Sequence, residues 1–501
     1  MIKENIIQDN LLLILFLLFT ITMLAMVSSK LKISYPIFLV IGGLLISLVP
    51  GIPNISLKPD FIFLIFLPPL LYAAAWNTVW ADFWKYKRPI GLLAFGLVLF
   101  TSALVAVVSH AIIPDFPLAY GFLLGGIISP PDAIAATSVL QGLKIPKRVV
   151  TILEGESLVN DASSLIVFRF ALAAILTGEF HLWNATQTFF IVALMGIAIG
   201  LVIAFIVYAI HRFFPTTAAI DAALTLITPY VMYITAEHFH YSGVLSVVTG
   251  GLFLSYHSQV IFSYESRLNI AGLWDTLIFL LNGFVFILIG LQLPSISQDL
   301  GNYSMGEAIF YGIAISLVTI VVRIVWVFPA AYIPRFLFKS IRQDEPKPSW
   351  KSVFLIGWSG MRGVVSLASA LAIPLTVGAG YDFRDRNLIL FITFVVILVT
   401  LVLQGLSLQP LIRLLKIEEN VKEKESEQIN SMALRVQLAE AVLAYLDTNY
   451  AEEIKANDTY QRVRDRYDRM IETAKKKLES EEEDADKSNA FLRVTGRCCW
   501  N

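Results

Sequence analysis

Three carboxylates, an amide and a hydroxyl lie close together between Glu154 and Asp161, at the start of a long apolar segment. A helix would place Ser157 and Asp161 on one face, and Glu156 and Asn160 on the neighbouring face. An acid inside an apolar membrane segment is costly and is rarely kept without a function. This stretch could therefore direct one carboxylate towards a partner and another towards a cavity.

The composition indicates a polytopic membrane protein. Of the 501 residues, 56% are hydrophobic and 15% are charged, and the mean hydropathy is +0.70. Soluble domains carry about 25% charged residues. We therefore expect membrane lipid around the chain and no nucleic acid as a partner.

A membrane-spanning helix needs about 20 mostly apolar residues, and this criterion predicts an all-α protein with about 13 transmembrane helices. The candidate segments are 10–28, 34–50, 60–77, 89–113, 118–140, 149–177, 186–210, 219–237, 242–257, 269–293, 306–334, 352–375 and 388–412. Lys and Arg, which favour cytoplasmic loops, gather in alternate loops such as Lys85–Arg88 and Lys144–Arg148. We therefore expect a multi-pass protein of the cell (plasma or inner) membrane with its N-terminus outside and its C-terminus inside.

Two of these segments are interrupted. The fifth contains Pro130 and Pro131, which lack backbone N–H groups and break a helix at mid-depth. The twelfth contains Gly360 and Arg362, flanked by two more glycines. If segments 1–6 and 8–13 form two halves, the halves begin on opposite sides of the membrane and the interruptions fall at corresponding positions. This pattern is typical of transporters built from inverted repeats.

Asp161 and Asp132 are the candidate ion- and proton-binding acids. Asp161 lies about 13 residues, or roughly 20 Å, beyond Arg148, which places it near the middle of the bilayer. Asp132 directly follows the break in the fifth segment. Together with the hydroxyls of Ser129 and Ser157 and unwound carbonyls, they predict an oxygen-rich site for a small hard cation such as Na⁺. Competition between a cation and a proton for Asp161 would couple the two fluxes.

A single arginine, Arg323, lies in the middle of the eleventh segment and needs an acidic partner there. Glu156 is the best-placed candidate, and Arg362 is a second cation that Glu156 could meet. Arg169 could shape an outer funnel or pair with an acid. Asp275 could line an inner entrance or begin a helix.

The chain after residue 415 has a different composition. Residues 416–501 are rich in charge, and Ile429–Tyr450 has the pattern of an amphipathic helix. The acidic run Glu479–Asp486 is typical of disorder. We therefore divide the chain into a transmembrane domain, residues 1–415, and a cytoplasmic helical tail, residues 416–501. The tail is either a solvated appendage or a dimerising or regulatory segment.

Several of these motifs resemble those of the monovalent cation:proton antiporters, especially the NhaP-type and sodium–proton exchanger branch. They are Glu156–Asp161, Pro131–Asp132, Arg323 and Gly360–Gly363. The resemblance covers roughly residues 10–415. It implies an NhaA-like fold of 13 helices in which two broken helices cross, with a core and a dimerisation subdomain. It also implies a homodimer, elevator-like alternating access and no cofactor besides the transported Na⁺ and H⁺.

The same resemblance implies roles for single residues. Asp161 corresponds to the ion- and proton-binding carboxylate, and Asp132 and Ser157 to supporting site residues. Asn160 resembles the asparagine of the Asn-Asp pair in the electroneutral branch. Glu156 and Arg323 correspond to a structural ion pair between helices.

Two departures from the family pattern concern the choice of ion. Many relatives carry Thr-Asp-Pro or a similar order at the crossover, where this chain has Pro130–Ala133. Many also carry an acid shortly after the Pro-Pro of the third segment, where this chain has Ala73–Ala75.

The predicted function is that of a transporter and not of an enzyme: electroneutral antiport of H⁺ against a monovalent cation, which is Na⁺ or else Li⁺ or K⁺, with a role in pH homeostasis. The alternatives are a K⁺-preferring antiporter and a gated cation channel. An intramembrane serine protease is disfavoured: Ser359 lies in a Gly-x-Ser-Gly pattern, but such chemistry needs a histidine base and no histidine follows Ser359.

Overall fold

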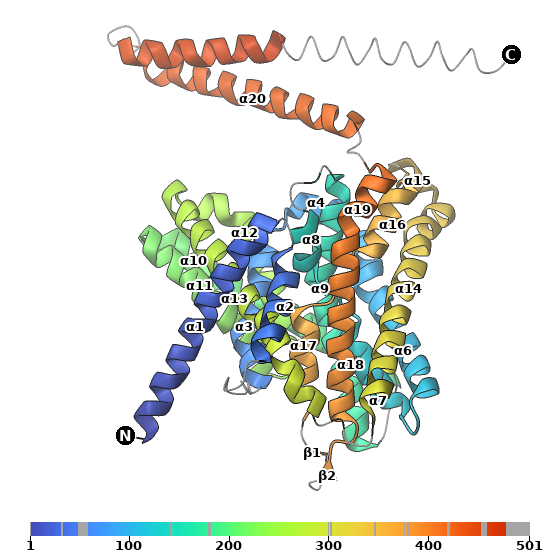
Figure 1. Cartoon of the computed structure of the whole chain (residues 1–501). Helices are drawn as coiled ribbons and strands as arrows, with labels where there is room; N and C mark the ends of the chain where they lie inside the picture. Colours follow the sequence, from blue (N-terminus) through green and yellow to red (C-terminus); the bar gives the residue numbers. More distant parts are fainter. Residues whose placement is uncertain are drawn as a thin grey trace, which may run out of the picture. The chain divides into compact units, whose positions relative to one another are not determined.

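The computed structural model describes residues 2–31, 34–48, 59–140, 143, 145–178, 182–298, 300, 303–344, 347–374, 376–377, 381–417, 421–451 and 458–476. The chain separates into two compact units, residues 1–417 and 418–501. Figure 1 shows the helices of the first unit. They are α1 (Ile2–Leu31), α2 (Tyr35–Ser47), α3 (Pro59–Asn77), α4 (Trp80–Lys85), α5 (Lys87–Gly91), α6 (Val98–Ile112), α7 (Leu118–Ile128), α8 (Ala133–Leu140), α9 (Lys147–Thr177), α10 (Leu182–Phe213), α11 (Ala218–His238), α12 (Gly243–Ile261), α13 (Tyr264–Gln298), α14 (Met305–Leu337), α15 (Lys339–Asp344), α16 (Trp350–Trp358), α17 (Val364–Leu371), α18 (Arg386–Val399) and α19 (Gly405–Leu415).

Short elements join some of these helices. Two π-helical stretches, η1 (Leu92–Leu97) and η2 (Thr400–Gln404), connect α5 to α6 and α18 to α19 without a break. Between α17 and α18, the two-residue strands β1 (Thr376–Val377) and β2 (Tyr381–Asp382) pair antiparallel.

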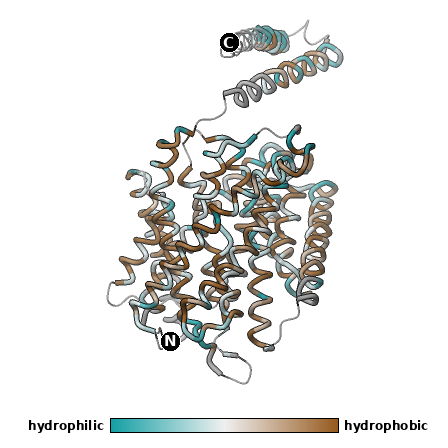
Figure 2. Tube along the Cα trace, turned by 90° about the vertical axis from the view of Figure 1, so that its right-hand side faces the viewer, coloured by the Kyte–Doolittle hydropathy of each residue, from teal (hydrophilic) through white to brown (hydrophobic). Residues whose placement is uncertain are grey.

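The all-helical membrane fold expected from the sequence is confirmed. Within the described residues, 10 helical stretches are long and apolar enough to cross a membrane, and α2 and Leu64–Asn77 are shorter apolar helices. Figure 2 shows hydrophobic residues along most of the length of the helices in the first unit. All thirteen segments contain helix in the structure, but the number of thirteen crossings remains a prediction, because several of these helices are too short to span alone.

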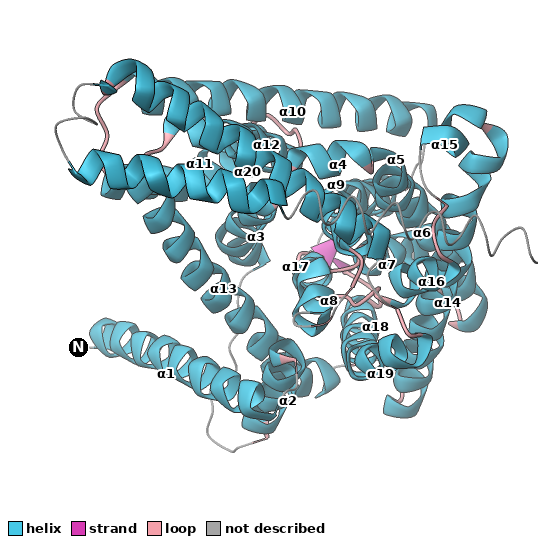
Figure 3. Cartoon of the chain, turned by 90° about the horizontal axis from the view of Figure 1, so that it is seen from above, coloured by secondary structure: helices cyan, strands magenta, loops and turns pink. Residues whose placement is uncertain are grey.

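Apart from the short helices α4 and α15, the helices of the first unit form two groups (Figure 3). The crossover group contains α5–α9, α14 and α16–α19, in which α7 packs on α6 and α9, and α14 packs on α16 and α18. The flanking group contains α1–α3 and α10–α13, in which α13 packs on α2 and α12 packs on α3, α10 and α11. The groups meet where α9 packs on α12, α17 on α3, and α18 on α13. Their identity as core and dimerisation subdomains remains a prediction.

Small residues allow close helix packing in the flanking group. A Cβ atom on Gly43 of α2 would overlap the backbone of α13 at Ile287, and one on Gly290 of α13 would overlap the backbone of α2 at Val40. Such small-residue contacts are common in membranes, where packing rather than hydrophobic burial drives helix association.

Both predicted helix interruptions are present. α7 ends at Ile128 and α8 begins at Ala133, because Pro130 and Pro131 cannot donate backbone hydrogen bonds. α16 ends at Trp358 and α17 begins at Val364. The residues between them include two glycines, which lower the cost of leaving the helix.

The second unit begins with helix α20 (Val421–Asn449). This helix begins earlier than the predicted Ile429 because the preceding Lys, Glu and Gln residues are themselves good helix formers. A further helical stretch covers residues 458–476, and Arg464 in this stretch donates to Asp447 of α20 at 2.9 Å. The acidic run Glu479–Asp486 lies outside the described residues.

Candidate ion-binding site

The two interrupted helices contact each other through the backbone at their breaks. The backbone N–H of Asp132 donates to the carbonyl of Met361 at 2.7 Å. In return, Nε of Arg362 donates to the carbonyl of Ile128 at 2.9 Å. The polar groups freed by each break are therefore partly satisfied by the other, as unwound backbone at membrane depth requires.

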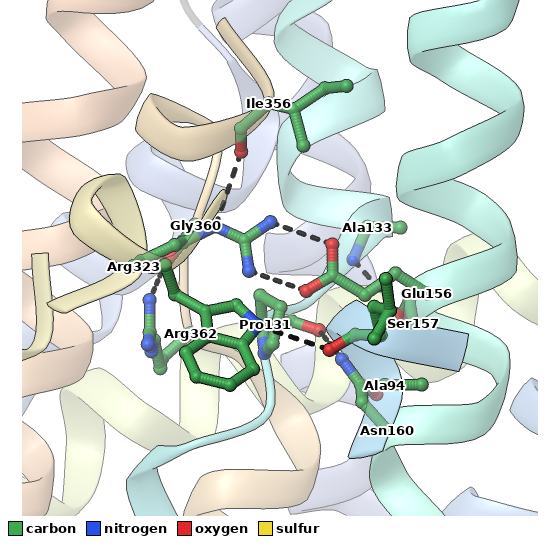
Figure 4. A network of polar contacts seen from close by, with 12 residues as sticks. Ala94, Pro131, Ala133, Glu156, Ser157, Asn160, Arg323, Ile356, Gly360 and Arg362 are labelled. Carbon is green, nitrogen blue, oxygen red and sulfur yellow. Dashed lines mark hydrogen bonds and ion pairs between the residues drawn. The ribbon is translucent and has the colours of Figure 1, made fainter. Parts of the chain in front are cut away.

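Two arginines cap the carboxyl ends of the first half-helices (Figure 4). Arg362 donates to Ile128 at the end of α7 and also to the carbonyl of Gly360. Arg323 of α14 donates through Nε to the carbonyl of Ile356, near the end of α16, at 3.3 Å. A cation at a helix C-terminus satisfies unpaired carbonyls and opposes the negative end of the helix dipole.

Asp132 occupies the complementary position at the amino ends of the second half-helices. Its Oδ1 accepts the N–H of Ile134 in α8 at 2.8 Å, and the N–H groups of Ala135 and Val364 also face its carboxylate. A Cβ on Gly363 would overlap this carboxylate, so a glycine is needed there. The positive ends of two half-helices therefore stabilise a negative charge on Asp132.

Glu156 and Arg323 form a bidentate ion pair. Arg323 Nη1 and Nη2 donate to the two carboxylate oxygens of Glu156 at 2.5 and 2.8 Å, and both residues are fully buried. Figure 4 shows the two groups facing each other between α9 and α14. This is the contact expected from the sequence. Arg362, the second cation considered for Glu156, donates to the carbonyls of Ile128 and Gly360 instead.

Asp161 lines a cavity of about 190 Å³ that it shares with Asp132 and Ser157. The Asp161 side chain is 8% exposed. Among the described residues it makes no ion pair and no hydrogen bond through its carboxylate. An ionised carboxylate in such a place is costly. Binding of a proton or of a cation would remove this cost.

The other predicted site residues hold the crossing in shape. Ser157 Oγ accepts the N–H of Ala133 at the start of α8, at 3.2 Å. Asn160 Nδ2 donates to the carbonyl of Pro131 at 3.0 Å (Figure 4). Asn160 is fully buried, and its amide therefore faces the break, whereas Asp161 faces the cavity.

The cavity lies towards one end of the bundle. It is also lined by Asn77 at the end of α3, Thr137 near the end of α8, and Glu154 in the first part of α9. All three lie on the Lys147 side of Asp161. In the topology expected from the sequence, this is the cytoplasmic side.

Arg169 has a partner that the sequence did not identify. Its Nη2 contacts both carboxylate oxygens of Glu237 on α11, at 2.8 and 2.6 Å. Glu237 also accepts the N–H of Gly243 at the start of α12, at 3.1 Å. The pair thus connects the crossover group to the flanking group on the opposite side of Asp161 from Lys147. Asp275 is exposed on α13.

Four polar residues that line the cavity were not predicted as site residues: Asn77, Thr137, Glu154 and Ser366. Glu154 was noted only as part of the acidic stretch, although it lines the cavity. Ser366 of α17 lines it as well. The available signal for Ser366 was its place in the first turn after the glycine-rich break, three residues beyond Gly363.

The chain was compared with known proteins. The family model described as "Sodium/hydrogen exchanger, transmembrane" matches residues 14–414. The "Sodium, potassium, lithium and rubidium/H(+) antiporter" of Bacillus pumilus is 35% identical over 386 residues, which are 75% of this chain and 57% of that protein. The protein of the same name from Bacillus subtilis is 35% identical over 74% of this chain and 56% of its own length. The chain thus spans little more than half of these two relatives.

Two further matches cover a larger share of the related protein. The Na(+)/H(+) antiporter ApNhaP of Aphanothece halophytica is 31% identical over 89% of this chain and 81% of its own length. The structure of the sodium proton antiporter MjNhaP1 from Methanocaldococcus jannaschii matches with a TM-score of 0.66 and 20% identity, over 80% of this chain and 99% of the other. The structural likeness shows a shared fold, and the family match over residues 14–414 shows that this chain belongs to the sodium/hydrogen exchanger family.

Proposed function

We propose that the protein is a secondary antiporter that exchanges a monovalent cation, Na⁺ in the first place, for H⁺ across the cell membrane. The observation that carries this proposal is the contrast between two acids at one cavity. Helix N-termini compensate Asp132, whereas Asp161 has no positive partner among the described residues. Asp161 is therefore the group that a proton or a cation must neutralise in turn.

A single exchanging acid favours electroneutral transport. Asn160 beside Asp161 is an uncharged amide that binds a backbone carbonyl. On the α3 side, the cavity is lined by Ala73 and Ala74 rather than by a further acid. If one carboxylate binds either one cation or one proton, each cycle moves one positive charge in each direction, and the membrane potential does not drive transport.

Alternating access would follow from movement of the crossover group against the flanking group. The cavity lies between them, since α3 and α13 contribute to its wall together with α8, α9 and α17. Its lining continues towards Asn77 and Glu154, which is the cytoplasmic side in a topology with the N-terminus outside. The flanking group would then form the homodimer contact, and the exchange would serve pH homeostasis.

The preference among Na⁺, Li⁺ and K⁺ has to be determined by experiment. The two Bacillus relatives carry potassium as well as sodium in their names, so a K⁺-preferring antiporter is the alternative within the same mechanism. Na⁺-, Li⁺- and K⁺-driven proton movement would be measured in proteoliposomes for the wild type and for Asp161→Asn. The membrane potential would first be clamped and then released. Asp275→Asn is the matched control, because it removes an exposed acid outside the cavity.

We expect cation-driven proton movement in the wild type and in Asp275→Asn, equal with and without a potential, and none in Asp161→Asn. Proton movement that survives in Asp161→Asn would refute the assignment of the site. Cation currents without proton coupling would identify a channel instead.

A further inference from the structure

The walls of the Asp161 cavity differ in the oxygen atoms they offer. Between Leu67 and Ala74, the wall formed by α3 is lined by hydrocarbon side chains, and Ile278 of α13 adds another. Hydrocarbon cannot replace the water that a cation loses on binding. Ligands for a cation at Asp161 must therefore come mainly from the helices of the crossing, α8, α9 and α17, or from water.

Much of the backbone at the crossing is already engaged. The carbonyl of Ile128 accepts a hydrogen bond from Arg362, and that of Pro131 accepts one from Asn160. The carbonyl of Met361 accepts the N–H of Asp132. These carbonyls stabilise the crossing, which leaves side-chain oxygens as the better source of ligands.

Ser366 offers such an oxygen from the second broken helix. It lies in the first turn of α17 and lines the same cavity as Asp132, Ser157 and Asp161. Its side chain is 1% exposed, and its hydroxyl has no hydrogen-bond partner within the described part of the protein. A buried hydroxyl without a partner is unfavourable, so the place of Ser366 beside two acids points to a ligand.

Among the described residues, the buried hydroxyls of Tyr72, Thr101 and Ser359 also lack a partner, but only that of Ser366 belongs to the cavity lining. Many other buried hydroxyls are satisfied within their own helix. Ser102, Ser316 and Thr393 are buried in helices, and each donates to the carbonyl four residues earlier, at 2.6–2.8 Å. That local bond is the usual way for a helical Ser or Thr to satisfy its hydroxyl in an apolar environment. Ser366 makes no such bond and faces the cavity instead.

We propose that Ser366 of α17 is a ligand of the transported cation. The other ligands are Asp161 and Ser157 of α9, so the cation lies at the crossing of the two broken helices. This inference rests on the proposed cation/proton exchange. A hydroxyl fixed on α17 sets the size of the site on that side, so Ser366 also favours the smaller cations Na⁺ and Li⁺ over K⁺.

The test compares Ser366→Ala, Ser366→Thr and Ser369→Ala in proteoliposomes, with Asp161→Asn as the inactive reference. Ser369 is the matched control: it is a serine on the same helix with 2% exposure, and it is absent from the cavity lining. The apparent KM for Na⁺, Li⁺ and K⁺ and the maximal rate are measured at one pH. In parallel, the rise in melting temperature caused by each chloride salt, relative to choline chloride, reports cation binding to the purified protein.

Loss of one ligand is expected to raise the KM of Ser366→Ala for Na⁺ and Li⁺ by about tenfold, with a smaller change for K⁺ and a maximal rate close to that of the wild type. The melting-temperature shift with Na⁺ should shrink in parallel. Ser366→Thr keeps the hydroxyl and should recover most of the affinity, and Ser369→Ala should behave as the wild type.

Wild-type KM values and melting-temperature shifts in Ser366→Ala would overturn the ligand assignment while leaving the exchange function in place. An equal loss in Ser366→Ala and Ser366→Thr would also overturn it, because packing rather than the hydroxyl would then be responsible. Retention of exchange in Asp161→Asn would instead refute the proposed function itself.

Discussion

Two acids on helix α9, Glu156 and Asp161, lie little more than one turn apart and are both buried, yet their surroundings differ completely. Glu156 meets Arg323 in a bidentate pair at 2.5 and 2.8 Å. Asp161 faces a cavity and makes no ion pair among the described residues. The first acid is neutralised by the protein, whereas in the proposed exchange the second is neutralised by the proton or cation that enters the cavity. In the proposed exchange, the same side-chain chemistry therefore supports structure on one face of the helix and transport on the next.

The energetics of the two sites should therefore differ in kind. A buried ion pair contributes little net stability, but removal of one partner leaves a buried uncompensated charge. A buried acid without a partner already carries that cost when it is ionised. Substitution should thus separate the two acids by their effects on stability and on transport.

The largest expected effect is on transport by Asp161→Asn. Without the carboxylate neither a proton nor a cation can be exchanged, and the rate should fall by at least about hundredfold, as for the loss of a charge-assisted contact. The melting temperature should stay equal to that of the wild type or rise, because a neutral amide replaces an uncompensated acid. Proteoliposome transport and thermal melting in detergent measure the two quantities. A marked fall in melting temperature would show that Asp161 also supports the fold.

Glu156→Gln should show the reverse pattern. Arg323 would remain buried without its counter-charge, and the free energy of unfolding should fall by about 3–5 kcal/mol. The double variant Glu156→Gln/Arg323→Gln should recover part of this loss, because it removes both charges. Thermal melting of the two variants and of Arg323→Gln alone forms a double-mutant cycle. Independent, additive losses would mean that the pair is not coupled.

The half-exposed pair Arg169–Glu237 tests whether burial or pair geometry sets this cost. It is also bidentate towards Arg169, but the two side chains are 43% and 29% exposed. Arg169→Gln should therefore cost only about 0.2–1 kcal/mol, and less at high salt. Glu237→Gln should cost more than Arg169→Gln, because Glu237 also accepts the N–H of Gly243. A loss as large as that of Glu156→Gln would contradict the role of burial.

The smallest effect is expected at Asp385, just before α18 and outside the membrane-spanning helices. Burial raises the pKa of Asp385, and the nearby Asp115 adds to this, while the hydrogen bond from Tyr303 and the charge of Arg384 oppose it. The folded protein then holds this proton to higher pH than the unfolded chain, in which Asp titrates near pH 4, at about 3.9. Stability should therefore fall as pH rises from about 4 through the raised pKa. Asp385→Asn should remove this part of the pH dependence. The same change of melting temperature between pH 4 and 7 in the variant and in the wild type would contradict the prediction.

Much of the fold could be predicted from the sequence, because a membrane helix is recognised from one continuous stretch of apolar residues. Long apolar runs predicted the helices, and Pro130–Pro131 and the glycines around Arg362 predicted the two interruptions. The need of a buried arginine for an acid predicted the contact of Glu156 with Arg323. The four-residue spacing of Ser157 and Asp161 correctly placed both on one face, which lines the cavity.

Contacts between distant segments were much less accessible. The partner of Arg169 is Glu237, on a helix whose neighbours could not be derived from hydropathy. The two N-termini that converge on Asp132 depend on how α8 and α17 cross. Asn160 was predicted as an ion-binding residue. In the structure its side-chain amide donates a hydrogen bond to the carbonyl of Pro131, which lies in the helix break.

The sequence by itself determined the helical membrane fold, the two breaks and the identity of the buried acids, because each follows from the high cost of polar groups in a lipid environment. The sequence also predicted that Glu156 is the acid paired with Arg323, and only the tertiary structure decided what surrounds Asp161 and Asp132. Glu156 and Asp161 have similar chemistry and similar depth, and they differ only in what lies opposite each helix face: an arginine of α14 for one, and an open cavity beside α17 for the other.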